Sequence, residues 1–152
     1  MRIKGSLLLA ATALLVAMIV PGMASAHGTH VKAKMSGDQV VGQAAGAPGA
    51  EGTANLHLLR NKGKVRFTIG YSGIGSRDGL EIGVYSGKRG ENGNELFNLV
   101  DQEKKDPIKG SVSGVAKRTL KKITRSPRRY HVNVKTDRYP VDGARRGQLK
   151  GV

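Results

Sequence analysis

Apolar and polar residues alternate along most of this sequence, and this period of two constrains the fold more than any other feature. From residue 31 to 35, Val31, Ala33 and Met35 alternate with two lysines. The same alternation recurs at 54–58, 65–71, 80–84 and 130–134. Successive side chains of a β-strand point to opposite faces, so each segment predicts a strand with one buried face.

Glycine, asparagine and proline separate these segments and predict the turns between short strands. The run from Arg60 to Gly63 lies between two alternating segments, which predicts a β-hairpin. A Gly-rich loop is expected from Ser86 to Asn94, and the short runs ELFNLV and GSVSGV beyond it predict further strands. With 22 glycines in the chain, this pattern predicts an all-β fold, an antiparallel β-sandwich.

Two segments depart from the alternation. The stretch 42–53 is rich in small residues and predicts an exposed connection between the first strand and the hairpin. From Lys117 to Thr124 the sequence fits either about two turns of helix, ended by Ser126 and Pro127, or a loop. The expected sandwich therefore has at most one short helix.

The N-terminus has the features of a secretory signal peptide. Two basic residues precede an apolar run from Leu7 to Val20, and an A-x-A cleavage site ends at Ala26. A membrane-spanning helix needs about 20 apolar residues, so this shorter run predicts cleavage and no remaining transmembrane anchor. We expect a signal peptide at 1–26 and one domain at 27–152, secreted to the extracellular space or the cell envelope. Because the chain has no cysteine, its stability depends on a packed core.

The last strands carry the most specific motifs of the chain. They read YHVNVKT from Tyr130, YPVDG from Tyr139, and ARRGQL from Ala144 to Leu149. These segments resemble the close of the CHRD (chordin-type) domain, whose strands and turn are of the types YVNVHT, YP with G, and EIRGQL. Weaker matches extend the resemblance to 31–151. The resemblance implies a single-domain secreted protein of the bacterial type, with a Greek-key-like sandwich similar to superoxide dismutases and immunoglobulin domains.

The resemblance also implies structural roles for three residues of the closing motif. Asn133 and Gln148 are expected to be polar fixtures near the turn. Arg146 takes the place of the motif arginine, and its planar guanidinium is expected to brace loop carbonyls or carboxylates. We therefore expect these three residues to hold the fold together rather than to catalyse a reaction.

The chain departs from the family at its histidines. In the family's AHIH segment two histidines alternate along one strand, and the matching residues here are Glu81 and Gly83. Lys135 replaces the histidine of VNVHT, and Ala144 replaces the glutamate of EIRGQL. We therefore expect no dismutase-like metal site in this protein.

Positive charge is concentrated in the second part of the chain. The formal net charge is +15, and residues 104–152 hold 15 cations and three acids. We predict a polyanion-binding surface that consists of Lys104, Lys105, Lys109, Lys117, Arg118, Lys121, Lys122, Arg125, Arg128 and Arg129. We expect Lys135, Arg138 and Arg145 to extend it. Such a cluster holds phosphates or carboxylates through point charges and forked hydrogen bonds.

The partner we expect is an anionic polymer or surface: envelope phosphates, an acidic polysaccharide or anionic lipid headgroups. Nucleic acid is a less favoured partner, because the chain has two Phe, four Tyr and no Trp for base stacking. The chain also lacks the G-x-S-x-G and H-E-x-x-H motifs and any cysteine nucleophile. We therefore predict a binding protein that is not an enzyme and needs no cofactor.

Copper binding is the alternative. Cleavage after Ala26 leaves His27 first, and its amine and imidazole together chelate copper, with His30 close by. The other two histidines, His57 and His131, are predicted on outward faces of strands. Against this alternative, HGTH also fits a flexible polar terminus.

Overall fold

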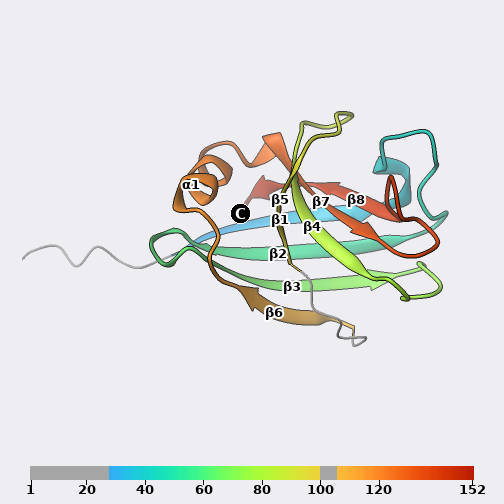
Figure 1. Cartoon of the computed structure of the whole chain (residues 1–152), viewed down its shortest axis with the longest axis horizontal. Helices are drawn as coiled ribbons and strands as arrows, with labels where there is room; N and C mark the ends of the chain where they lie inside the picture. The colour runs from blue at the N-terminus through green and yellow to red at the C-terminus, as the bar shows by residue number, and fades with distance from the viewer. Residues whose placement is uncertain (1–27, 100–105) are drawn as a thin grey trace, which may run out of the picture.

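The computed structural model describes residues 28–99 and 106–152 (Figure 1). The predicted signal peptide, His27, Lys104 and Lys105 lie outside the described residues. The elements are β1 (Thr29–Ser36), η1 (Gly37–Gln39), β2 (Glu51–Leu59), η2 (Arg60–Lys62), β3 (Lys64–Ser72), β4 (Glu81–Ser86), β5 (Glu95–Asn98), β6 (Ile108–Val112), α1 (Lys117–Arg125), η3 (Pro127–Arg129), β7 (Tyr130–Lys135), β8 (Arg145–Gln148) and β9 (Lys150–Gly151).

The strands form one continuous antiparallel sheet that folds over on itself. Its order is β5-β4-β7-β8-β1-β2-β3-β6, and β9 pairs with β1. The two halves meet at β1 and β8, where Ser36 pairs with Arg146. In Figure 1 β4 and β5 cross over the layer of β1, β2 and β3. The predicted all-β sandwich with one short helix is confirmed.

The core lies between the two halves and is built from the residues that the alternation assigned to inward faces. Val31, Leu56 and Ile69 come from one half of the sheet, while Val84 and Val132 come from the other, and all five are buried. The predicted hairpin pairs β2 with β3 from Glu51↔Ser72 to Leu59↔Lys64. The alternating pattern therefore identified the strands and their buried faces, because burial of one face determines register.

Two ambiguities of the sequence are resolved. The segment from Lys117 is a helix, and its Leu120 and Ile123 are buried against the core. Among the described residues no helix is long and apolar enough to cross a membrane. The prediction of an exposed connection at 42–53 is wrong in part. Ala47 and Ala50 are buried there, because Ala47 N donates to Ala144 O at 2.8 Å and Gly37 N donates to Ala50 O at 3.0 Å.

Candidate anion-binding surface

Helix α1 is a two-sided platform. Leu120 and Ile123, three positions apart, share the face that packs into the core, and both have an exposed fraction of 0%. The remaining faces carry five exposed cations, which are Lys117, Arg118, Lys121, Lys122 and Arg125. No Asp or Glu occurs between residues 107 and 136. The helix therefore presents positive charge to solvent without an acidic neighbour in its own segment.

The turn between β2 and β3 brings further positive charge to the helix. Gly63 has a φ of 57°, and a Cβ built on it would lie 2.8 Å from Val115 O. Glycine at this position lets the turn approach the start of the helix, where Val115 N donates to Gly63 O at 3.0 Å. The two segments enclose an open cavity of about 510 Å³, which is lined by Arg60, Asn61, Lys117, Arg118 and Lys121.

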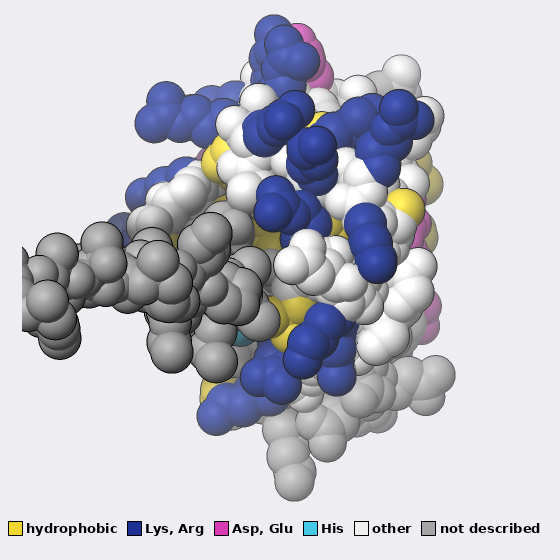
Figure 2. All heavy atoms as spheres, turned by 90° about the vertical axis from the view of Figure 1, so that its left-hand side faces the viewer, with side chains coloured by type: hydrophobic (Ala, Val, Ile, Leu, Met, Phe, Trp, Pro, Cys, Tyr) yellow, Lys and Arg dark blue, Asp and Glu magenta, His cyan; other side chains and the backbone are white. Residues whose placement is uncertain are grey.

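We call the exposed cations of η2, α1 and η3 the basic end. They are Arg60, Lys62, Lys117, Arg118, Lys121, Lys122, Arg125, Arg128 and Arg129. Figure 2 shows Lys and Arg side chains spread over this side of the molecule, with Asp and Glu at its margins. Sequence reasoning treated 60–63 only as a turn and missed Arg60 and Lys62. The sequence did hold one indication that these two cations lie in a basic region, since no Asp or Glu occurs between residues 52 and 77.

Gln148 of the closing strand holds one edge of the basic end. Its Nε2 lies 2.8 Å from Arg128 O, 2.8 Å from Tyr130 O and 3.0 Å from Gly87 O. These carbonyls belong to η3, to the start of β7 and to the loop after β4. A single side-chain amide, half-buried at the end of β8, therefore joins the segment that carries Arg128 and Arg129 to the sheet.

Arg146 lies beside Gln148 and holds the same loop. Its Nη2 donates to Lys88 O at 2.8 Å and to Glu91 O at 2.6 Å, and its Nη1 donates to Asn92 Oδ1 at 3.0 Å. Burial lowers the pKa of Arg146, and the nearby Glu91 opposes that shift. The structure thus places Arg146 against loop carbonyls, the kind of partner expected from the motif.

Asn133, the third residue of the motif, lies within β7, and its side chain reaches the turn that joins β7 to β8. Its Nδ2 donates to Asp142 O at 3.0 Å. Gly143 has a φ of 100°, and a Cβ there would fall 2.2 Å from Asn133 Oδ1. The turn therefore needs glycine next to this amide.

Tyr85 occupies the face on which the family's AHIH histidines would lie. A Cβ on Gly83 would be 2.8 Å from Tyr85 Cε2, so the tyrosine ring fills this space. Its hydroxyl donates to Glu95 Oε2 at 3.2 Å. Burial, followed by the charge of Glu95, raises the pKa of Tyr85. Within the described ranges, no three His, Cys, Asp or Glu side chains form a group that could hold a metal.

His131 was predicted to lie on an outward face of its strand. This prediction is wrong, because other segments cover this face of β7 and the histidine is buried. His131 has an exposed fraction of 2%, stacks on Tyr85 at 5.6 Å between ring centroids, and places Nδ1 3.3 Å from Gly87 O. Burial and the charge of Arg146 lower its pKa to about 4, against the opposing contact with Gly87. The ring is therefore neutral at neutral pH.

Four cations predicted for the surface lie away from the basic end. Lys109 is exposed on β6 opposite Thr68, towards the other end of that strand. Lys135 and Arg138 lie at the end of β7 and in the turn before β8. The prediction that Arg145 extends the surface is wrong, because its exposed fraction is 0%. Arg145 pairs with the inward-facing Val134 and shares its direction into the core.

The two histidines near the start of the domain form a cross-strand pair. His30 on β1 pairs with His57 on β2, and their rings stack with centroids 4.1 Å apart and planes at 9°. Partial burial, His30 and Arg66 all lower the pKa of His57. His57 therefore favours the neutral imidazole, which is the form that binds metals.

Comparison with known proteins gives one match. The model of the CHRD domain family matches residues 31–149, which include every strand except part of β1 and the last strand, β9. No curated protein and no solved structure matches the chain.

Proposed function

The chain belongs to the CHRD domain family, and from this premise we propose that it is a secreted binding module whose basic end holds an anionic polymer. The proposal includes export through the signal peptide at 1–26 and a location outside the cell or in its envelope. It assigns the protein binding rather than catalysis.

One observation carries this proposal: the cavity between η2 and α1. Arg60 lies far from Lys117, Arg118 and Lys121 in the sequence, yet all four line one concavity of about 510 Å³. Four positive charges around one concavity repel each other, and a bound anion relieves that repulsion. The cavity is open to solvent, as binding to a long polymer requires.

The chemistry of binding follows from the two kinds of cation. Arginine grips phosphate or carboxylate through two parallel hydrogen bonds, whereas lysine acts as a point charge on a flexible stem. Because these side chains are exposed, each single contact is weak and screened by salt. Affinity therefore comes from several contacts made at once with neighbouring groups of one polymer.

The proposal is tested with a variant in which Lys117, Arg118, Lys121 and Lys122 are replaced by Gln. Long-chain polyphosphate serves as the probe, and affinity is measured at a series of NaCl concentrations. Each lost phosphate contact lowers the slope of log K against log salt by about 0.7 to 0.9. We therefore expect the slope to fall by up to about 3 and the affinity at low salt to fall with it.

A matched control removes the same charge elsewhere. Replacing Lys34, Lys109, Lys135 and Arg138 by Gln also lowers the net charge by four, but leaves the basic end intact. We expect this control to retain most of the salt slope. Equal losses in the two variants would reduce the proposal to a non-specific effect of net charge, and no loss in either would refute it.

Copper binding is a second candidate, favoured by the stacked pair of His30 and His57. Two imidazoles, together with a histidine amine at a processed terminus, supply the nitrogen ligands that Cu(II) prefers. Titration of the processed protein with Cu(II) tests the idea. His57→Ala should weaken copper binding about tenfold or more and leave polyphosphate binding unchanged. Unchanged copper affinity would exclude the pair as ligands.

A further inference from the structure

Gly70 lies in the interior of β3, where the fold gives no reason for a glycine. Glycine in a strand lowers stability relative to residues with a side chain. Strands keep a glycine at a bulge, at a left-handed φ, where another backbone comes close, or where a ligand approaches. Each of the first three causes leaves a mark in the structure.

None of the three structural causes applies to Gly70. It pairs with Thr53 in an unbroken ladder between β2 and β3, so there is no bulge. Its φ is not in the left-handed range. A Cβ built on it would meet only two side-chain atoms, Thr53 Oγ1 at 3.4 Å and Asp106 Oδ1 at 3.8 Å, and both are ordinary contact distances. The fold therefore tolerates a side chain at this position.

The other glycines within β1 to β8 differ from Gly70 in this respect. A Cβ built on each of them would lie between 2.5 and 2.8 Å from an atom of another residue, and they are Gly52, Gly83, Gly110 and Gly147. Close packing thus requires glycine at these four positions. At Gly70 the missing side chain instead leaves a space that no other described segment fills.

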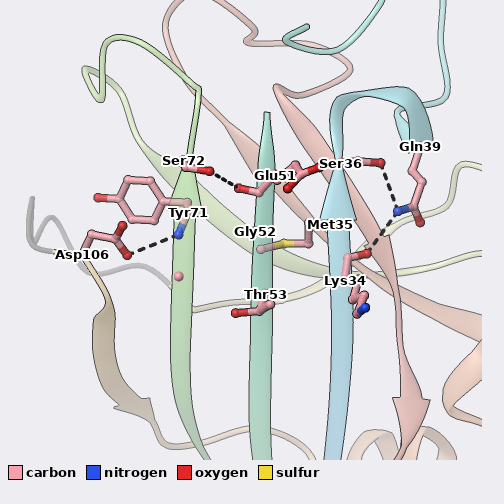
Figure 3. Close-up of a pocket in the computed structure, with 11 residues that line it drawn as sticks. Lys34, Met35, Ser36, Gln39, Glu51, Gly52, Thr53, Tyr71, Ser72 and Asp106 are labelled. Atoms are coloured by element: carbon pink, nitrogen blue, oxygen red, sulfur yellow. Dashed lines mark hydrogen bonds between the residues drawn. The ribbon is translucent and has the colours of Figure 1, made fainter. Parts of the chain in front are cut away.

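This space belongs to a groove of about 560 Å³ on the outward face of β1, β2 and β3, which we call the sheet groove. Gln39 of η1 lies at one flank and Asp106, just before β6, lies at the other. Thr53 lies between them (Figure 3). The volume is within the range of about 300 to 1,000 Å³ that small-molecule sites occupy.

The sheet groove offers both donors and acceptors of hydrogen bonds. A hydroxyl can donate and accept, and three hydroxyl groups of the lining come from Ser36, Thr53 and Ser72. The charged side chains of the lining are one cation, Lys34, and two acids, Glu51 and Asp106. The groove therefore lacks the excess of positive charge that marks the basic end.

This balance of charge favours a neutral ligand. A polyanion would place its charge against Glu51 and Asp106, and a cation would approach a chain of net charge +15. A neutral molecule rich in hydroxyl groups avoids both costs. Each of its hydroxyls can donate to a carboxylate and accept from Lys34 or from a hydroxyl of the lining.

Both flanks of the sheet groove are fixed by hydrogen bonds of the protein itself. Gln39 Nε2 donates to Lys34 O at 3.1 Å and to Ser36 Oγ at 3.2 Å. On the other flank, Asp106 Oδ1 accepts from Tyr71 N at 3.3 Å. Groups that are already held in place lose little conformational freedom when a ligand binds.

We propose that the sheet groove binds a neutral saccharide, with a sugar ring over Gly70 and its hydroxyls bonded to Thr53 and Asp106. The ligand is uncharged and the groove is lined by none of the cations of the basic end. This proposal and the proposed binding of an anionic polymer are therefore independent.

The test uses the full chain labelled with ¹⁵N and, as probes, neutral hexasaccharides of glucose, of mannose and of N-acetylglucosamine. We expect at least one of them to shift the amide signals of Gly70 and Thr53 saturably. Its Kd should be the same at low and high NaCl, because an uncharged ligand releases no counterions. The variant of the basic end with four glutamines should bind it as tightly as the wild type.

Gly70→Val fills the sheet groove and separates binding from folding. Valine suits a strand, so the melting temperature should stay the same or rise, while the affinity for the saccharide falls at least about tenfold. Gly70→Ala is the smaller second variant if valine prevents folding. A merely structural role of Gly70 predicts the reverse, a loss of stability with unchanged binding.

A matched pair of variants tests the hydroxyl. Thr53→Val removes a hydroxyl from the groove and should weaken saccharide binding about fivefold. Thr68→Val removes a hydroxyl from the same face of β3 outside the groove, and should change the affinity by less than about twofold. Equal effects of the two variants would contradict the proposed site.

Three other outcomes would overturn the proposal. The first is that no hexasaccharide shifts the two amide signals. The second is that Gly70→Val folds and binds as tightly as the wild type. The third is that only a diamine such as putrescine shifts these signals, which would make the sheet groove a cation site formed by its two acids.

Discussion

Exposed cations at one end of the molecule contrast with the buried arginine pair at the close of the chain. The basic end keeps its lysines and arginines in water, where each is replaceable. Arg145 and Arg146, by contrast, have exposed fractions of 0% and 2%. Their guanidinium groups have left water, so each depends on acceptors supplied by the fold. The same residue type is therefore solvated in one region and buried in the other.

The two buried arginines also differ from each other. Arg146 has three acceptors in the loop after β4. Arg145 has one acceptor, and two of its donors have none among the described residues. Adjacent residues on a strand point to opposite faces, so one guanidinium meets a loop that covers the sheet and the other enters the core. The loop thus satisfies the first guanidinium, whereas the second keeps two nitrogen atoms without an acceptor among the described residues.

The largest expected effect is on stability, from Arg146→Gln. The change removes three hydrogen bonds and leaves loop carbonyls without their donor, which should cost about 4 kcal/mol of unfolding free energy. Urea denaturation measures this loss. The control Arg125→Gln, at an exposed position of α1, should change stability by less than about 0.5 kcal/mol. Similar values for the two variants would contradict the distinction between the regions.

A smaller effect is expected from His131, which lies buried near Arg146. Its pKa is about 4 in the folded protein, against 6.5 for an ordinary histidine. The unfolded chain therefore takes up this proton first as the pH falls. The folded protein should lose about 3 kcal/mol of stability between pH 6.5 and pH 4 through this group.

Variant His131→Asn isolates this contribution, because other groups also titrate in acid. Asparagine keeps a donor for Gly87 O but does not ionise in this range. Unfolding free energies of the two proteins, measured from pH 7 to pH 4, should converge as the pH falls. A constant difference between the curves would show that His131 does not titrate as expected.

The smallest effect is expected from Gln148→Ala, which loosens the link between the two regions. Loss of the contacts to Arg128 O, Tyr130 O and Gly87 O should cost about 2 kcal/mol. Hydrogen exchange should accelerate at the amides of η3. Gln39→Ala is the control. Gln39 bonds to Lys34 and Ser36 at the C-terminal end of β1, away from η3, so its loss should leave exchange at η3 unchanged. Equal exchange in both variants would mean that Gln148 does not hold the basic end.

Much of the fold was predictable because its signals are local. Val31, Ala33 and Met35 repeat every two residues, and this period by itself assigns a strand and its buried face. The closing motif was predictable for a different reason, since it resembles a known family. His131 was mispredicted because alternation states which face a side chain takes, but not whether another segment covers that face.

The candidate site was predictable only in part. The cations of α1 are neighbours in sequence, so their cluster was visible before the structure. Arg60 was missed and Lys109 was included, because sequence distance does not report which turn packs against the helix. Arg145 was placed on the surface for its charge, although its position opposite Val134 directs it inward.

The sequence by itself determined the strands, the hairpin and the excess of positive charge, because each follows from the order or the composition of nearby residues. Only the tertiary structure decided which charges are solvated and which are buried. That outcome depends on contacts between distant segments, such as Gly63 with Val115 and Gly52 with Arg145. The free energy of a charged group is set by its surroundings in space, and these exist only once the sheet has folded over on itself.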